Sequence, residues 1–231
     1  MVNVLIVESE NDKYFLEALI HHLNYGDIDV ADPICAIDDY KCLGGLSLKR
    51  LTNALFYLKD EVQTANGIQK IGIILDMDNE TETSRIQMVN TAIQDTFEID
   101  EQLKSVSEFI TVDIDGYSQV KIACYFTNVE GKGELETVLK AIKSKPSTYA
   151  DCLTDWRECI EAAGQKVTDK DFNKFWISIY QRFDCCNKRE KYQAARKCSH
   201  EASMKKAIYN FDSPILDHFK QFLSLFNSVD N

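Results

Sequence analysis

The sequence predicts an α/β fold in which a mostly parallel sheet lies between helices, followed by a helical extension at the C-terminal end. Short runs rich in Val, Ile and Leu are typical of strands that are buried on both faces of a parallel sheet. These runs alternate with stretches in which apolar residues recur at helical spacing, as in β-α-β units. Beyond Pro146 the helical pattern continues alone. We therefore predict an α/β core at residues 1–145 and a helical extension, packed on that core, at residues 146–231.

Strands and helices alternate through the first part of the chain. The apolar run at residues 2–7 predicts the first strand, and helical spacing over residues 12–23 predicts a helix that Asn11 or Asp12 could cap. A second strand is expected within residues 27–36, interrupted near Pro33. The same patterns then predict, after a turn at Gly44-Gly45, a helix around residues 48–58, a strand at 70–75 and a helix at 80–97.

A hairpin and a helix are predicted in the last part of the core. Residues 109–114 and 120–126 predict a β-hairpin because Asp115-Gly116 supplies suitable turn residues, and its second strand could enter the main sheet. A polar loop at residues 127–133 then leads into a predicted helix at 133–143. Beyond Pro146, helical spacing predicts helices at residues 149–164, 171–182, 188–207 and 214–226.

The charge of the chain is unevenly distributed. A net charge of −11 argues against a protein that binds nucleic acid through its overall charge. Residues 182–206 nevertheless carry eight lysines and arginines against three acidic residues, a local net charge of +5. An acidic body with one basic segment suits a metal-dependent enzyme with a localised phosphate contact. It suits a solvated helix face equally well.

The cysteines and the N-terminus predict a cytoplasmic protein. The eight cysteines are scattered without a repeated framework, which favours reduced thiols. The group Cys185, Cys186, Cys198 and His200 lacks the Cys-x-x-Cys spacing of a zinc knuckle, so we do not expect zinc there. No apolar run is long enough to span a bilayer, and the chain begins on a strand without a basic leader, so no membrane partner or signal peptide is expected.

Acidic residues follow two of the predicted strands at the point where each strand ends. Glu8 and Asp12 follow the first strand, and Asp76 and Asp78 follow the strand at residues 70–75. The carboxyl ends of parallel strands line the crevice where open α/β sheets bind ligands. Carboxylates that converge there without a fixed counter-charge repel one another unless they gather divalent cations. The purely structural interpretations are that Asp12 caps its helix and that Asp76 and Asp78 form a solvated turn.

These residues resemble the Toprim domain of topoisomerases, primases and OLD-family nucleases, which has a Glu after its first strand and an Asp-x-Asp after a later one. The match here is Glu8 with Asp76-Met77-Asp78. A closer resemblance, over nearly the whole chain, is to a Toprim-like family of uncharacterised prokaryotic proteins related to the OLD-family domain. That family's further marks are matched by Gly44-Gly45, Gly133-Glu134-Leu135-Glu136 and the basic tail, whereas Ser9 stands where the family has Gly. The resemblance implies a Rossmann-like Toprim fold.

The resemblance also implies roles for individual residues. It makes Glu8 a metal ligand or general base, and Asp12 has the spacing of the second acid in OLD-type nucleases. Glu136 matches the glutamate of the family's Gly-x-Leu-Glu, although a helix dipole would favour a carboxylate there in any case. Lys188, Arg189 and Lys191 are the candidate cations for the transition state, and Lys191 is the one chosen, although exposed lysines are mostly solvated. The expected set is catalytic Glu8 and Lys191, with Mg²⁺ (or Mn²⁺) held by Glu8, Asp12, Asp76, Asp78 and Glu136.

The expected function is a divalent-metal-dependent phosphodiesterase or nuclease acting on nucleic acid, DNA or RNA, with a place in prokaryotic defence or repair implied by the resemblance. OLD-type Toprim domains work fused to an ATPase. The present chain has no Walker motif, so any ATPase would be a separate partner, and a homodimer stays open. The main alternative is an inactive or metal-binding Toprim module that recruits a partner. A small-molecule phosphotransferase is a second alternative.

Overall fold

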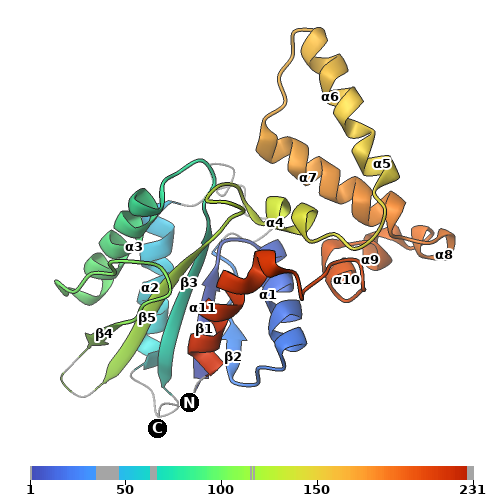
Figure 1. Ribbon diagram of the computed structural model, residues 1–231. Coiled ribbons are helices and arrows are strands. Elements are labelled where there is room, and N and C mark those ends of the chain that lie inside the picture. The colour runs from blue at the N-terminus through green and yellow to red at the C-terminus, as the bar shows by residue number, and fades with distance from the viewer. Residues whose placement is uncertain (1, 35–46, 63–66, 115, 117, 228–231) are drawn as a thin grey trace.

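The computed structural model describes residues 2–34, 47–62, 67–114, 116 and 118–227, which form a sheet-containing body and a projecting helical arm (Figure 1). Gly44-Gly45 lies outside these residues. The body holds a five-stranded sheet of order β2-β1-β3-β5-β4, in which β4 alone runs antiparallel to its neighbour. The predicted mostly parallel sheet and the hairpin strand that joins it are confirmed. The strands are β1 Val2–Val7, β2 Ile28–Val30, β3 Ile68–Asp76, β4 Ile110–Asp113 and β5 Gln119–Thr127.

Helices cover both faces of the sheet, as the alternation of side chains along the strands requires. Helices α2 (Leu48–Val62) and α3 (Glu82–Phe97) pack in one core with Ile6 and Ile73. Helices α1 (Glu10–Leu23) and α11 (Asp217–Asn227) pack in the other core with Leu5, Val7 and Ile74. Within the described ranges, no helix combines the length and apolar character needed to cross a membrane.

The last helix, α11, returns from the C-terminal part of the chain to the sheet (Figure 1). Its Phe222 and Phe226 are fully buried, and the ring of Phe219 lies 4.6 Å from that of Tyr125 on β5. The side chain of Asn3 on β1 donates a hydrogen bond to the carbonyl of Phe226. Thus α11 packs on the predicted core, while the boundary at residue 145 stays a prediction.

Gly72 lies where β3 meets α11, and a larger residue there should destabilise the fold. A Cβ at this position would lie 2.5 Å from Cδ2 of Leu5 and 2.8 Å from Cζ of Phe226, both closer than van der Waals contact. We expect Gly72→Ala to lower the free energy of unfolding by about 1–3 kcal/mol, as overpacking commonly does, measured by urea denaturation. Gly26→Ala is the control because a Cβ there meets nothing within 4 Å. Equal urea midpoints for the two variants would contradict the packing of α11 on β3.

The arm consists of helices α5 to α7 and joins the body through α4. Its base is fixed, since Trp176 and Tyr180 are buried in the same core as Leu139 of α4. Helix α6 has no buried residue and projects with α7 away from the sheet (Figure 1). The helices are α4 Leu135–Ala141, α5 Thr148–Asp151, α6 Leu153–Ala162 and α7 Asp169–Ile179, and α7 continues into the π-helical turn η2, Tyr180–Asp184.

The predicted single helix at residues 188–207 is wrong, because three short helices occupy this stretch. They are α8 Lys188–Lys191, α9 Ala194–Lys197 and α10 His200–Met204. Asn187 caps α8 and Ser199 caps α10, and such polar side chains favour a new helix start over a continuous helix.

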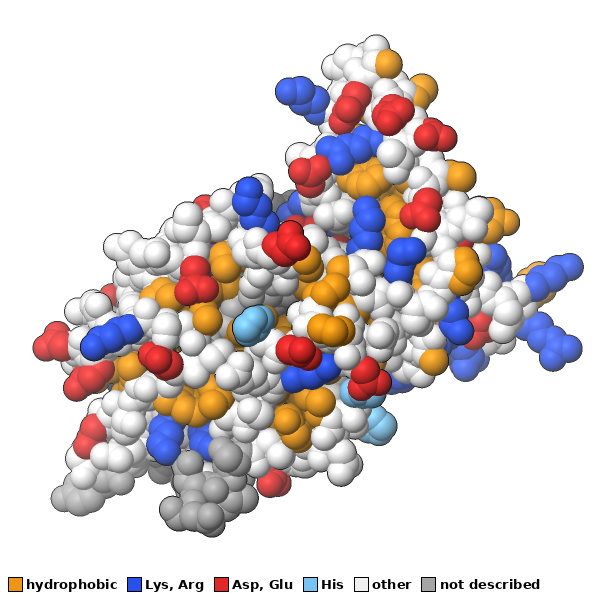
Figure 2. All heavy atoms as spheres, in the orientation of Figure 1, with side chains coloured by type: hydrophobic (Ala, Val, Ile, Leu, Met, Phe, Trp, Pro, Cys, Tyr) orange, Lys and Arg blue, Asp and Glu red, His pale blue; other side chains and the backbone are white. Residues whose placement is uncertain are grey.

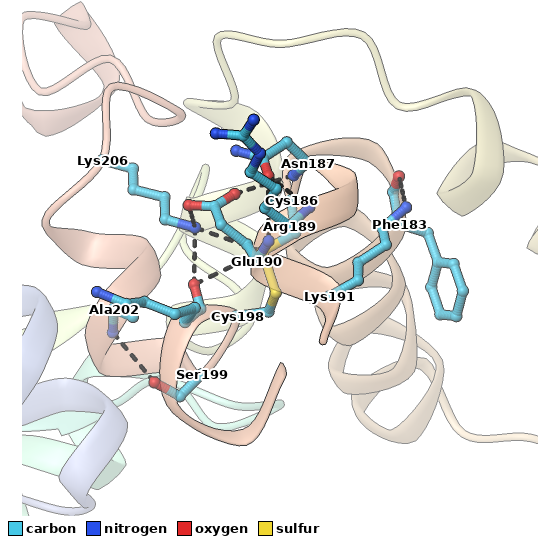
Figure 3. The surroundings of a disulfide bond; sticks show 11 residues. Phe183, Cys186, Asn187, Arg189, Glu190, Lys191, Cys198, Ser199, Ala202 and Lys206 are labelled. Atoms are coloured by element: carbon cyan, nitrogen blue, oxygen red, sulfur yellow. Dashed lines mark hydrogen bonds and ion pairs between the residues drawn. A yellow bond between two sulfur atoms is a disulfide. The ribbon is translucent and has the colours of Figure 1, made fainter. Parts of the chain in front are cut away.

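The structure pairs Cys186 with Cys198 in a disulfide that spans α8 and α9 (Figure 3), which differs from the expectation that all thiols are reduced. It also takes two of the four residues considered for zinc. Of the other cysteines, Cys35 and Cys42 lie outside the described residues, and Cys124, Cys152, Cys159 and Cys185 are free.

Candidate functional site

Four of the five predicted metal ligands lie together at the carboxyl edge of β1 and β3. Val7 pairs in parallel with Ile74, so Glu8 emerges from β1 beside the end of β3, where Asp76 lies. Asp12 and Glu136 reach the same place from the first turns of α1 and α4, and the charges of Glu8, Asp12 and Glu136 all raise the pKa of Asp76. We call Glu8, Asp12, Asp76 and Glu136 the carboxylate cluster.

Three acids of the carboxylate cluster are buried and Glu8 is half-buried, and burial is the largest cause of the raised pKa of each. Asp12, Asp76 and Glu136 are 6%, 8% and 6% exposed. Burial, together with the charges of Glu8 and Glu136, raises the pKa of Asp12 to about 7, although hydrogen bonds from Ser9 oppose the shift. Burial and the three other acids raise the pKa of Asp76 well above its usual value. Simultaneous ionisation of several of these acids is therefore unfavourable in the absence of a bound cation.

Asp12 has a second role at the start of α1. The helix begins at Glu10, and its cap is Ser9 rather than the predicted Asn11 or Asp12. The backbone N–H of Ser9 donates to Oδ2 of Asp12 at 2.9 Å and the backbone N–H of Asp12 donates to Oγ of Ser9 at 3.4 Å, which forms a capping box. The hydroxyl of Ser9 also donates to Oδ2 of Asp12, at 2.5 Å. Ser9, which departs from the glycine of the resembling family, is therefore the residue that orients Asp12.

Asp76 fixes α4 to the edge of the sheet. Its Oδ1 accepts a hydrogen bond of 3.1 Å from the backbone N–H of Leu135. The backbones of Asp78 and Gly133 also bridge each other, and Gly133 has the positive φ of 94° that glycine adopts without strain. These contacts place Glu136, on the first turn of α4, beside Asp76.

Asp78 is bound differently from the other acids. Its carboxylate forms ion pairs with Nη2 of Arg85 and with Nζ of Lys170, each at 2.7 Å. The expectation that the acids have no fixed counter-charge is therefore wrong for Asp78. The same two cations lower the pKa of Glu8, which burial raises.

Three cations beside the acids were missed by the sequence analysis: Arg85 on α3, and Lys170 and Lys174 on α7. Lys174 lowers the pKa of Glu136, which burial raises more strongly. The only sequence signal was the spacing of four residues between Lys170 and Lys174, which puts them on one face of a helix. Which surface that face would meet depends on how the arm joins the body.

Lys191 lies elsewhere. On α8 it donates a hydrogen bond of 3.1 Å to the carbonyl of Phe183 (Figure 3), and its Nζ lies 5.3 Å from the centre of the Phe183 ring and 6.0 Å from that of Tyr149. These contacts belong to the base of the arm. None of them reaches the carboxylate cluster.

The ligand chemistry of the cluster fits a hard divalent cation. All its ligand atoms are carboxylate oxygens, the type that Mg²⁺ and Mn²⁺ prefer. Oε2 of Glu8 is buried without a hydrogen-bond partner, and a cation would satisfy it. As the side chains stand, the described part of the chain contains no group of three or more His, Cys, Asp and Glu residues that could hold a metal ion. Asp12 faces Ser9 and Asp76 faces Leu135, so these carboxylates would have to reorient.

Comparison with known families gives a match to residues 2–227, which include the carboxylate cluster, its cations and the arm. The matching family is described as "Protein of unknown function (DUF3226)". Neither the curated proteins nor the solved structures contain a match to the chain. A functional conclusion therefore rests on the geometry of the site.

Proposed function

The chain belongs to the DUF3226 family, and we propose that it is a divalent-metal-dependent phosphodiesterase or nuclease that acts on nucleic acid through a Toprim-like carboxylate site. The observation that carries the proposal is the buried carboxylate cluster at the carboxyl edge of β1 and β3, with the unpartnered Oε2 of Glu8 inside it. Mutual repulsion among buried acids is a cost that a bound cation would remove. A role in prokaryotic defence or repair belongs to the same proposal.

Each residue has a definite part in this proposal. Glu8, Asp12, Asp76 and Glu136 would hold Mg²⁺ or Mn²⁺, which, when bound, supplies Lewis-acid stabilisation of phosphate charge and a more acidic water. If the other three acids hold the cation, Glu8 can instead accept a proton at Oε2, which has no hydrogen-bond partner. Lys170 takes the part first assigned to Lys191, because it lies beside both Glu8 and Asp78 and can turn its ammonium group to a phosphate oxygen.

A partner-recruiting module without catalysis is the second candidate, and one observation favours it. The carboxylate of Asp78 is already neutralised by Arg85 and Lys170, which removes one acid from the predicted metal site. A protein that uses these ion pairs only to fix its arm to its body would have the same contacts and no need of a metal.

The first test compares the melting temperature of the wild type and Glu8→Gln in Mg²⁺ and Mn²⁺. We expect a saturable rise of about 5–10 °C for the wild type, because a ligand at a hundred times its Kd adds about 2.7 kcal/mol and 1 kcal/mol shifts a domain of this size by about 2–4 °C. Glu8→Gln should lose most of the rise, together with Mg²⁺-dependent cleavage of DNA or RNA. Glu17→Gln, which changes an exposed acid on α1, should behave as the wild type.

The outcomes separate the two candidates. A rise that persists in Glu8→Gln would show that the cation binds outside the carboxylate cluster. A wild type that neither gains stability from the cations nor cleaves single-stranded DNA, duplex DNA or RNA would favour the partner-recruiting module instead.

A further inference from the structure

A pocket of about 540 Å³ borders the carboxylate cluster, and Glu136 belongs to both. Besides Glu136 on α4, its walls come from three parts of the chain: the first turn of α1 with Asn11, helix α7 with η2, and the segment of α9 and α10. In Figure 2, lysine and arginine side chains gather where the arm joins the body. A volume of this size is typical of pockets that enclose a ligand as large as one nucleotide.

The lining of this pocket is suited to an anion. Lys174 and Arg182 contribute two positive charges against the single carboxylate of Glu136, so the lining has a net charge of +1 in a chain whose net charge is −11. Arg182 lies on η2, a π-helical turn, and such turns are frequent at functional sites. Ammonium and guanidinium groups are the side chains that bind phosphate most strongly.

His200 is an independent sign of a missing ligand. Its Nδ1 lies 3.1 Å from the amide nitrogen of Gln181, a donor, so the proton of the neutral ring is on Nε2. That Nε2 is buried and makes no hydrogen bond of normal geometry, although His200 lines the pocket. The backbone of Asn11, on the facing wall, lies near enough to raise the pKa of the ring, which burial lowers more strongly. A buried N–H without a well-placed acceptor is costly, and an oxygen of a phosphate group would satisfy it.

The wall that carries His200 is held in place by several contacts. The disulfide between Cys186 and Cys198 ends next to Ser199, and Nζ of Lys206 binds Oε1 of Glu190 at 2.9 Å and the carbonyl of Lys197 at 2.7 Å (Figure 3). The pocket is therefore bounded by fixed structure on this side and does not depend on closure of a loop.

We infer that this pocket binds a phosphate group of a single-stranded nucleic acid, one position away from the phosphate that is cleaved at the carboxylate cluster. That the ligand is a nucleic-acid strand rests on the proposed function. That the pocket binds a phosphate group rests on the pocket alone. Lys174, Arg182 and His200 would contact the phosphate, and Glu136 would mark the border between this subsite and the cleavage site. Because the pocket has room for one nucleotide, a double helix has to open before its strand enters.

The first experiment titrates the full chain with inorganic phosphate, without divalent cations, and follows the melting temperature. The variants are Arg182→Ala and Lys174→Gln, both at exposed positions, and the control is Arg189→Ala, which removes an exposed positive charge outside the pocket. We expect saturable stabilisation of the wild type and of Arg189→Ala, with a loss of affinity of roughly tenfold for each cation removed from the pocket. No stabilisation of the wild type, or equal stabilisation of all four proteins, would overturn the inference.

The second experiment measures cleavage of a single-stranded oligonucleotide and of the same sequence as a blunt duplex. Arg182→Ala should raise KM for the single strand about tenfold and leave kcat within about threefold, since a flanking contact contributes mainly uniform binding. Cleavage with an unchanged KM, or faster cleavage of the duplex, would overturn the inference while the proposed function stands. Phosphate binding that is lost in the variants, in a protein that cleaves nothing, would support the pocket and contradict the proposed function.

Discussion

Replacing Asp76 with asparagine is expected to lower the rate of metal-dependent cleavage by on the order of a thousandfold and, at the same time, to stabilise the metal-free protein. The loss follows because a bound cation contributes several kcal/mol of charge stabilisation, and each 1.36 kcal/mol is a factor of ten in rate. The gain follows because burial and the neighbouring acids raise the pKa of Asp76 well above its usual value, and a carboxyl group whose pKa is raised by folding lowers the stability of the fold above its unfolded-state pKa.

Asparagine is the informative substitution at this position because its side-chain oxygen can still accept the hydrogen bond from the N–H of Leu135. The start of α4 should therefore stay in place. Cleavage rates with Mg²⁺ and urea denaturation in a chelator are measured on the same preparations, with Asp95→Asn, an exposed acid on α3, as the control. A variant of Asp76 that loses stability would indicate a purely structural carboxylate, and one that keeps its activity would exclude it as a metal ligand.

The position of the acids could be predicted from the sequence because it follows from strand order. Glu8 and Asp76 each end an apolar run, and neighbouring parallel strands must place their carboxyl ends at the same edge. Local pattern also gave the hairpin of β4 and β5, since two apolar runs that follow each other closely in the sequence pair antiparallel. Predictions of this kind need only local pattern and the geometry of a sheet.

The counter-charges could not be predicted in this way. Lys170 pairs with Asp78 across 92 residues of sequence, and the contact depends on the angle at which the arm leaves the body. Helix periodicity shows which face of α7 is apolar but not what lies opposite its lysines. The expectation that the acids have no counter-charge was therefore wrong for Asp78. Lys191, which was chosen as the catalytic cation, packs against Phe183 instead.

The break-up of residues 188–207 into three helices has a similar cause. Helical spacing was read across Ser199, which caps a new helix, and the pairing of Cys186 with Cys198 joins positions 12 residues apart. A continuous helix would rise about 1.5 Å per residue, which keeps such positions about 18 Å apart. Their Cα atoms lie 6.1 Å apart, so a turn in this segment is a geometric necessity of the disulfide.

The metal-free protein is expected to become less stable, through Asp12, as the pH rises from about 4 to about 7. Burial, assisted by Glu8 and Glu136, raises the pKa of Asp12 from 3.8 to about 7 in the folded state. Between these values the folded chain binds more protons than the unfolded chain, so stability falls with rising pH, and the loss is complete above about pH 7. The difference between a pKa of 3.8 in the unfolded chain and one of about 7 in the folded chain corresponds to on the order of 4 kcal/mol.

Asp12→Asn isolates this contribution, because asparagine cannot ionise but can still accept the hydrogen bond from the N–H of Ser9. His200, whose pKa burial lowers to about 4, acts in the opposite direction between pH 4 and 6.5, so the quantity to follow is the difference between variant and wild type. In a chelator we expect the two proteins to be about equally stable at pH 4, with the variant more stable by a few kcal/mol at pH 8. Added Mg²⁺ should reverse the order at pH 8, because deprotonated carboxylates bind the ion. A difference that does not grow with pH would contradict the burial of a protonated Asp12, and a variant that keeps its Mg²⁺ response would remove Asp12 from the proposed ligands.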